Sequence, residues 1–250
     1  MQLFLIRHGE SANNALGVGD ISYEDYMAQR SPDPGLTQIG KRQAEMVAQH
    51  LAADRHPESR NGTPLASTRA GYGIQTLYVS AMLRALQTAR PIAAALGLEP
   101  QLMVDIHEHG GVFLGNPRSE TDPVRPYTGL TRAEIEERFP GYVVPAEISE
   151  KGWWAGGYET IDVCEERAVR VAAALKERAD AEPQAVIGMV THGTFMDRLL
   201  KALLHGTHSR DFFFFHYNTA ITRVDFIVDG PVVLRYTNRT QHLLPELITK

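Results

Sequence analysis

The first hydrophobic segment of the chain is a short unbroken run at residues 3–6, which ends at a polar stretch that contains a glycine. A run of this length predicts a strand buried on both faces, and such strands are typical of parallel sheets. The next apolar positions, between Ile39 and Leu51, recur three and four residues apart. This spacing predicts a helix, with Thr37 as its N-cap.

The same alternation continues along the chain. Residues 75–80 predict a second strand, and residues 83–96 predict a helix that contains Pro91 and ends at Gly97. The later elements are expected in this order: a strand at 104–106, a helix at 159–181, a strand at 185–191, a helix at 195–204, and a hairpin whose strands at 220–228 and 232–237 flank Asp229-Gly230-Pro231. Alternating strands and helices predict an α/β fold, a three-layer sandwich whose mostly parallel sheet carries helices on both faces.

Two long segments depart from this rhythm. Residues 54–73 are polar and rich in Gly, Pro, Ser and Arg, which predicts a mobile surface insertion. Residues 110–131 directly follow a predicted strand end, so we expect this segment, and the chain as far as residue 158, to cover an active site. No change of composition marks a boundary, and residues 1–250 are therefore predicted to form a single domain.

Composition narrows the class of protein. Hydrophobic residues make up 43% and charged residues 22% of the 250 residues, which is typical of a globular domain. The formal net charge of -5 argues against nucleic-acid binding, and no apolar run has the length of a membrane span. We expect a cytoplasmic protein that binds neither nucleic acid nor membrane, and the sequence leaves homo-oligomerisation open. Cys164, the single cysteine, excludes an internal disulfide and is expected to be buried.

Candidate chemistry begins at the end of the first strand, with Arg7-His8-Gly9-Glu10. Open α/β sheets bind ligands at the carboxyl ends of their strands. An arginine, an imidazole and a glycine, with Asn14 nearby, suit a site that holds a dianion beside a nucleophile. Neutral imidazole has a free lone pair near pH 7 and needs no separate base, so this chemistry requires no metal. Further cations are expected at other strand ends, because phosphoryl transfer depends mainly on position and charge.

The other predicted strand ends carry groups that fit. Arg84 follows the second strand, Glu108 the third and His192 the fourth. Arg84 alone is more simply a solvated surface arginine, and His192 alone a structural histidine. The coincidence of these groups at equivalent topological positions favours one shared site. His192 opens a helix and is expected to become cationic beside a bound dianion, while Thr194 lies where the N-terminal amides of that helix point.

At this point a family resemblance becomes visible. Arg7-His8-Gly9-Glu10, the segment at 80–89 around Arg84, Glu108 and His192-Gly193 together resemble the histidine phosphatase superfamily, in its phosphoglycerate mutase-like branch. Residues 218–222 resemble the late strand of that family, so the similarity spans nearly the whole chain. The resemblance implies a phosphoglycerate mutase-like fold, a small phosphorylated substrate, no cofactor and no metal.

The resemblance also implies a role for each matched residue. His8 is the nucleophile that forms a phosphohistidine, and Glu108 protonates the leaving oxygen. The cationic clamp around the phosphoryl group and the additional phosphate hydrogen bonds are assigned as follows: Arg7, Arg84 and His192 form the clamp, while Ser11, Asn14 and the backbone amides of Gly193 and Thr194 add hydrogen bonds.

The residues after Glu108 separate the activities within this family. The mutase pattern has Arg-His-Tyr-Gly after the acidic residue, whereas Glu108 is followed by His109-Gly110-Gly111-Val112. We therefore expect a phosphomonoester hydrolase, with a cofactor-dependent phosphoglycerate mutase as the alternative. A non-catalytic phosphate-binding module is less favoured, because none of the reactive residues is missing.

Three other features receive simpler interpretations. His107 and His109 flank Glu108, but no further ligand spacing supports a metal site. The run at 212–215, four phenylalanines, is expected to be a buried strand or a helix edge. For Trp153 and Trp154 two interpretations stay open: one ring lines the substrate pocket, or both anchor a packed loop.

Overall fold

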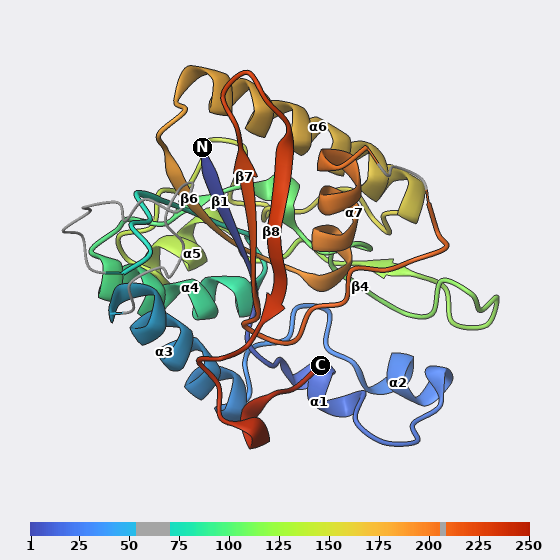
Figure 1. Ribbon diagram of the computed structural model, residues 1–250. Helices are drawn as coiled ribbons and strands as arrows, with labels where there is room; N and C mark the ends of the chain where they lie inside the picture. Colours follow the sequence, from blue (N-terminus) through green and yellow to red (C-terminus); the bar gives the residue numbers. More distant parts are fainter. Residues whose placement is uncertain (54–70, 206–208) are drawn as a thin grey trace.

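The computed structural model describes residues 1–53, 71–205 and 209–250, and its centre is a six-stranded sheet with the order β3-β2-β6-β1-β7-β8 (Figure 1). The middle strand β1 (Gln2–Arg7) pairs in parallel with β6 (Val186–Thr191) and in antiparallel with β7 (Ile221–Phe226). The remaining strands extend the sheet on both sides: β2 (Thr76–Val79) and β3 (Gln101–Leu102) continue its parallel part, and β8 (Val232–Arg239) its antiparallel part. The expected mostly parallel sheet is confirmed.

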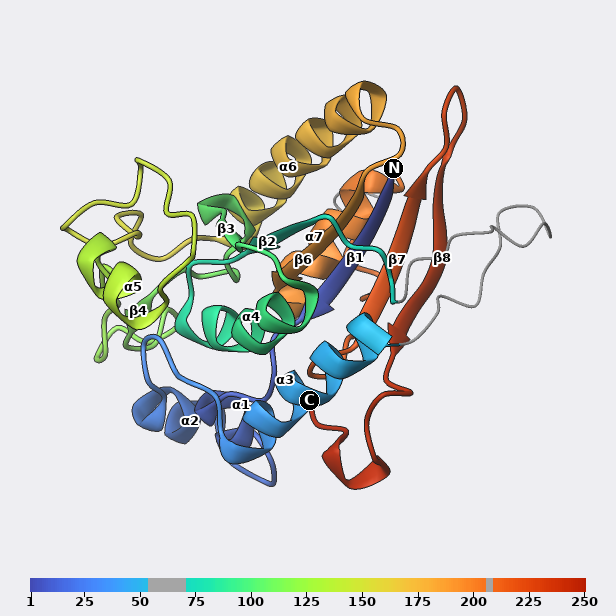
Figure 2. The same cartoon turned by 90° about the vertical axis from the view of Figure 1, so that its left-hand side faces the viewer.

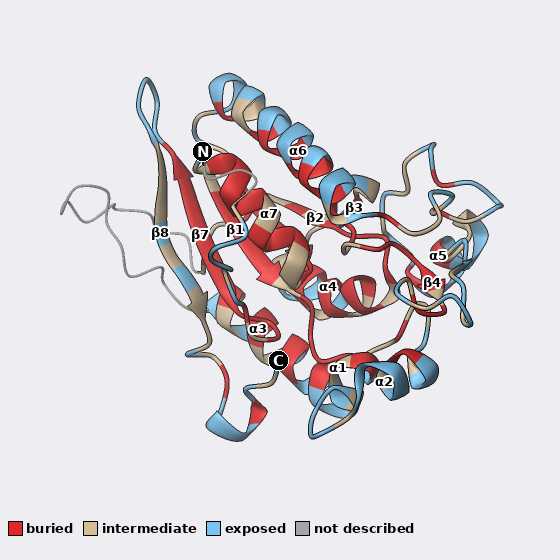
Figure 3. Cartoon of the chain, turned by 90° about the vertical axis from the view of Figure 1, so that its right-hand side faces the viewer, coloured by how far each residue is buried: buried red, intermediate tan, exposed pale blue. Residues whose placement is uncertain are grey.

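Helices cover both faces of this sheet (Figures 2 and 3). On one face lie α3 (Gln38–Ala53) and α4 (Leu83–Leu96), and on the other lie α6 (Ile161–Ala181) and α7 (Gly193–Leu203). The unbroken apolar run of β1 follows from this arrangement. Phe4 and Ile6 pack into the core beneath α3 and α4, while Leu3 and Leu5 pack into the core beneath α6 and α7. The three-layer sandwich is therefore confirmed.

Local signals place the helix ends at the residues that the sequence predicts or within two residues of them. Thr37 caps α3, because its Oγ1 accepts from the Gly40 amide at 3.0 Å. Gly97 ends α4 in the left-handed region at φ 66°, where glycine avoids the steric cost of a side chain. Thr160 caps α6 by accepting from the Val163 amide, so this helix begins two residues after Glu159, the expected start.

Two predictions were wrong. The expected strand at 104–106 is a 3₁₀ turn, η2 (Val104–Ile106), and the strand is the two-residue β3 before it. The last bond between β2 and β3 runs from the Met103 amide to Val79 O at 2.9 Å. Pairing stops after it because the chain turns, with the His107 amide donating to Val104 O. The run at 212–215 is neither strand nor helix, and Phe212, Phe213 and Phe215 are 47%, 50% and 43% exposed.

The periodicity gave no indication of several short elements around the site. These are α1 (Ala12–Leu16), α2 (Tyr23–Gln29), the hairpin of β4 (Phe113–Leu114) and β5 (Arg125–Pro126), α5 (Arg132–Arg138) and η3 (Pro245–Leu247). Most of the expected insertion at 54–73 lies outside the described residues. Within the described part of the chain, no helix combines the length and the apolar character that a membrane crossing requires.

Candidate active site

His8 lies just beyond the end of β1 and is 3% exposed. The Nε of Arg84 donates to His8 Nε2 at 3.1 Å, so Nε2 carries a lone pair and Nδ1 carries the proton. This Nδ1–H donates to the carbonyl of Gly9 at 2.7 Å, which fixes the ring. Burial first, and then the charges of Arg84 and Arg7, hold the pKa of His8 well below its ordinary value. The imidazole is therefore neutral and presents Nε2 as a nucleophile.

Arg84 occupies the first turn of α4 and is held there by Asp33. The Arg84 Nη1 lies 3.8 Å from Asp33 Oδ1, and the same carboxyl group accepts from the Leu83 amide at 3.1 and 3.3 Å. Burial raises the pKa of Asp33 to about 6, although Arg84 and the Leu83 amide oppose the shift. Sequence analysis missed Asp33, since an aspartate between two prolines reads as a turn residue.

Arg7, the last residue of β1, contributes a second buried guanidinium. Its Nη1 donates to the carbonyl of His216 at 2.6 Å, whereas its buried Nε has no hydrogen-bond partner among the described residues. Burial lowers the pKa of Arg7 to about 10, partly offset by Glu108. A buried cationic donor without a partner costs free energy unless an acceptor binds to it, and a phosphoryl oxygen beside His8 is such an acceptor.

His192, at the N-cap of α7, lies against the nucleophile. Its ring centroid is 5.0 Å from that of His8, its Nε2 is 2.8 Å from Ser80 Oγ, and its buried Nδ1 has no partner among the described residues. Burial, followed by the charge of Arg84, keeps the pKa of His192 well below its ordinary value. The cationic form expected beside a bound dianion thus depends on the negative charge of that dianion.

Glu108 is fixed by backbone amides at the start of α7. Its Oε2 accepts from the Thr194 amide at 3.1 Å, and its Oε1 accepts from the amides of Phe195 at 3.0 Å and His109 at 2.9 Å. In this structure the Thr194 amide, which the resemblance assigns to phosphate, donates to the acid, and its contact with phosphate stays a prediction. A Cβ at Gly193 would lie 3.5 Å from Arg7 Nε, an ordinary van der Waals contact, and the expected contact between the Gly193 amide and phosphate stays a prediction.

Ser11 and Asn14 meet in the capping box of α1. Asn14 Oδ1 accepts from the Ser11 amide at 3.1 Å and from Ser11 Oγ at 2.9 Å. Because its oxygen is engaged in this way, Asn14 has its Nδ2 donor group left for the pocket that both residues line. Asn218 adds a backbone contact, since its Nδ2 donates to the carbonyl of His8 at 3.0 Å.

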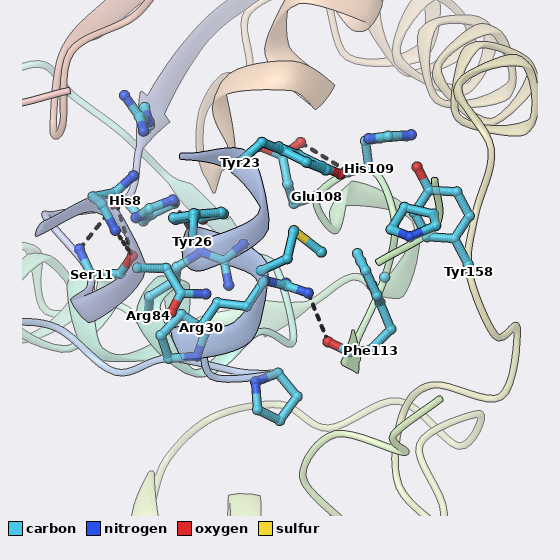
Figure 4. Close-up of a pocket in the computed structure, with 18 residues that line it drawn as sticks. His8, Ser11, Tyr23, Tyr26, Arg30, Arg84, Glu108, His109, Phe113 and Tyr158 are labelled. Carbon is cyan, nitrogen blue, oxygen red and sulfur yellow. Dashed lines mark hydrogen bonds between the residues drawn. The ribbon is translucent and has the colours of Figure 1, made fainter. Parts of the chain in front are cut away.

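These side chains line one pocket of about 270 Å³ (Figure 4). At its inner end lie six residues that the sequence singled out: Arg7, His8, Ser11, Asn14, Arg84 and Glu108. His192, Gly193 and Thr194 are absent from the described lining and lie behind it. The sequence did not indicate the outer residues, which are Tyr23, Tyr26, Arg30, His109, Phe113 and Tyr158.

The sequence raised three further features: a possible metal site, the two tryptophans and the single cysteine. In residues 1–53, 71–205 and 209–250, no group of three His, Cys, Asp or Glu could hold a metal ion. The described pocket lining includes neither tryptophan: Trp154 packs against Gly111, and Trp153 against Gly129, so both anchor a packed loop. Cys164 is buried as expected, and burial raises the pKa of its thiol to about 12.

The chain belongs to the histidine phosphatase superfamily, because the family model for branch 1 matches residues 3–66, 59–126 and 123–239. A phosphoserine phosphatase from Entamoeba histolytica in complex with 3-phosphoglyceric acid is similar in structure, with a TM-score of 0.55 and 24% identity over 97% of this chain and 99% of that one. A putative α-ribazole-5'-P phosphatase from Escherichia coli has a TM-score of 0.58 and 18% identity over 96% and 97% of the two chains. At these identities the likeness shows the fold.

A mycobacterial glucosyl-3-phosphoglycerate phosphatase in complex with VO3 has a TM-score of 0.52 and 21% identity, covering 96% of this chain and 99% of that one. A curated relative, a PE-PGRS family protein of Mycobacterium tuberculosis, is 32% identical over 114 residues, which is 45% of this chain. That match spans 15% of the relative's length.

Proposed function

We propose that this protein hydrolyses phosphomonoesters through a phosphohistidine formed on His8, with Glu108 as the proton donor. The observation that carries the proposal is the hydrogen bond from Arg84 Nε to His8 Nε2 at 3.1 Å, in a pocket that Glu108 also lines. This bond leaves the nucleophilic lone pair unprotonated and places a guanidinium beside the position of the incoming phosphoryl group.

In the first step, His8 Nε2 forms a bond to phosphorus while the bond between phosphorus and the ester oxygen breaks. Glu108 gives its proton to the departing oxygen, which leaves as an alcohol. Arg84 Nε, relieved of its contact with Nε2, then donates to a phosphoryl oxygen. Arg7 contributes its Nε, which has no partner among the described residues, and the Nδ2 of Asn14 adds a neutral donor.

In the second step, water attacks phosphorus and the bond between phosphorus and Nε2 breaks. Glu108, now a carboxylate, takes a proton from that water, and inorganic phosphate leaves. The acid that protonates the leaving group in the first step is thus the base in the second. Its three amide contacts hold one carboxyl group in place for both steps.

The sequence after Glu108 favours hydrolysis over phosphoglycerate mutation. Gly110 and Gly111 both have positive φ, 91° and 69°, and they follow Glu108 where the mutase pattern has other residues.

A panel of phosphorylated metabolites tests this proposal by measurement of released phosphate. We expect turnover by the wild type and near-total loss in the His8→Ala variant, since that change removes the covalent pathway itself. The same assay with 3-phosphoglycerate and catalytic bisphosphoglycerate follows 2-phosphoglycerate as well. Rapid formation of the isomer with little free phosphate contradicts hydrolysis and makes the protein a mutase.

A further inference from the structure

The outer half of the pocket has a different chemistry from its inner half. Aromatic rings from three separate segments line it: Tyr23 and Tyr26 from α2, Phe113 from β4, and Tyr158 from the segment before α6. Figure 4 shows His8 and Ser11 at one end and Phe113 and Tyr158 at the other. A leaving group attached to a phosphate at His8 therefore extends toward these rings.

Arg30 joins the two sides of this outer half. Its Nη1 donates to the carbonyl of Phe113 at 2.8 Å, and its Cζ lies 4.2 Å from the centroid of the Phe113 ring. Burial lowers the pKa of Arg30, with the nearby Tyr26 opposing the shift. No described carboxylate forms an ion pair with Arg30, so the aromatic rings and a backbone carbonyl form its surroundings. The guanidinium thus extends the aromatic wall.

Phe113 and Tyr158 are held in a fixed mutual orientation. Their ring centroids are 4.9 Å apart at an interplanar angle of 81°, an edge-to-face pair. Gly110 makes room for this pair, because a Cβ at that position lies 2.8 Å from Phe113 Cε1 and 3.5 Å from Tyr158 Cε2. Phe113 is 7% exposed, and burial raises the pKa of Tyr158. The wall is a built surface rather than a set of freely rotating side chains.

Size limits what this surface can accept. The pocket volume of about 270 Å³ is at the lower end of ligand sites, which typically run from about 300 to 1,000 Å³. The hydroxyl groups of a polyol would lose water wherever the faces of these rings form the pocket wall, at a cost in free energy. A planar ring loses no hydrogen bonds there and gains stacking or edge contacts with Tyr26, Phe113 and Tyr158.

We propose that the site selects small phosphomonoesters whose alcohol carries an aromatic ring, seated against Tyr26, Phe113 and Tyr158. This substrate class rests on the proposed hydrolase function. The phosphate occupies the inner end, at Arg7, His8 and Arg84, and the ring occupies the outer end beside Arg30.

The test compares three esters of simple primary alcohols, whose similar acidity matches the chemical step, with one polyol ester. We choose 2-phenylethyl phosphate, 2-cyclohexylethyl phosphate, n-butyl phosphate and glycerol 3-phosphate. Contacts between the phenyl ring and the aromatic wall predict a kcat/KM for the phenylethyl ester about 10-fold above that of the butyl ester, with the difference mainly in KM. The kcat/KM for the phenylethyl ester should also exceed that for the cyclohexylethyl ester. Equal kcat/KM values across the four esters overturn the proposal.

Two variants locate the preference. Phe113→Leu and Tyr26→Leu should each narrow the ratio between the phenylethyl and butyl esters, through KM for the phenylethyl ester. Tyr26 is only partly buried, so Tyr26→Leu remains informative if Phe113→Leu fails to fold. The matched control is Tyr127→Leu, an exposed ring outside the described pocket lining, which should leave the ratio unchanged. An unaltered ratio in Tyr26→Leu contradicts the proposed seat of the ring.

Binding separates the substrate class from the reaction. Calorimetry with 3-phenylpropylphosphonate and pentylphosphonate, in which a CH₂ group replaces the ester oxygen, measures the same preference without hydrolysis. Tighter binding of the phenyl compound with no turnover of any ester overturns the hydrolase function and supports the aromatic subsite. Turnover of every ester, together with equal affinities for the two phosphonates, supports the hydrolase function and overturns the aromatic subsite. If the enzyme prefers 3-phosphoglycerate, whose alcohol carries a carboxylate, to the four esters, and Arg30→Gln abolishes that preference, the aromatic substrate class is overturned in favour of carboxylate-bearing esters.

Discussion

Arg84 Nε donates a hydrogen bond to His8 Nε2 across 3.1 Å, so the imidazole is an acceptor at the atom that must attack. A protonated imidazole has no lone pair there, and two cations do not face one another at hydrogen-bond distance. The carbonyl of Gly9 holds the opposite ring nitrogen at 2.7 Å. Together these contacts choose one tautomer of His8 and keep it neutral.

Buried neutral histidines make the fold sensitive to acid. The pKa of His216 is lowered to about 4 and that of His242 to about 3, chiefly by burial, and those of His8 and His192 are also lowered. Unfolded histidines bind protons below pH 6.5, so the free energy of unfolding decreases as the pH falls below that value. Each of these histidines lowers the free energy of unfolding by about 1.4 kcal/mol for every pH unit between 6.5 and its own lowered pKa. The raised pKa of Asp33 acts in the opposite direction and offsets about one histidine.

Urea unfolding at pH 7.5, 6.5 and 5.5 measures this slope. His216→Asn should flatten it by about one proton, whereas the exposed control His205→Asn should not alter it. A free energy of unfolding that stays constant or rises between pH 6.5 and 5.5 contradicts the buried neutral state.

Asp33 should introduce an acid limb into the pH profile. Its pKa of about 6 means that the partner carboxylate of Arg84 ionises only above that value. Because the ionised form orients Arg84 toward His8, kcat/KM should rise with pH through about 6. Asp33→Asn keeps an acceptor for the Leu83 amide but carries no charge. Its kcat should be about 10-fold lower, and its kcat/KM should no longer rise through about pH 6, when both proteins are assayed with one substrate. An identical profile in the variant contradicts the orienting role.

Glu108→Gln should affect esters according to their leaving groups. An alkoxide needs a proton as it departs and a phenolate needs it less, so kcat should fall by about 100-fold or more for alkyl phosphates and much less for aryl phosphates. Steady-state assays on one alkyl and one aryl ester measure the difference. Equal losses on both would assign Glu108 an electrostatic role instead.

A buried ion pair secures the loop before Glu108. Arg167 Nη2 and Nε contact Glu159 at 2.6 and 2.8 Å, and Arg167 Nη1 donates to the carbonyls of Asp105 and His107. Arg167→Met leaves a buried carboxylate without its partner and should lower the free energy of unfolding by about 3–5 kcal/mol. The control Arg125→Met breaks an exposed ion pair and should cost about 0–1 kcal/mol. Similar losses in both variants contradict the role of burial.

The parts of the fold predicted from the sequence are those with a strong local signal. Residues 83–96 match α4 because apolar periodicity and Gly97 mark its face and its end. The short strand β3 was misplaced because a two-residue edge strand is defined by pairing with Tyr78 and Val79, which has no periodicity in the sequence. The exposed side chains of Phe212, Phe213 and Phe215 show the same limit, because hydrophobic character does not decide burial in an irregular segment.

The candidate site divides in the same way. Arg7, His8, Arg84 and Glu108 follow strands or turns at one edge of the sheet, so topology alone predicts that they meet, and they line one pocket. Asp33, Arg30 and Tyr26 reach it from a segment that carries no chemical motif, and only tertiary packing brings them there. The Thr194 amide was assigned to phosphate because helix N-termini bind anions, whereas the structure shows this amide donating to Glu108 Oε2, a contact that the sequence does not reveal.

The central claim is a covalent phosphohistidine on His8, and trapping that intermediate tests it most directly. The enzyme is mixed with a ³²P-labelled ester, quenched within milliseconds in alkali and mapped by peptide. The account predicts label that survives alkali, is lost in acid, maps to the peptide with His8 and is absent from His8→Ala. Turnover without any label, or acid-stable label on another residue, would contradict it.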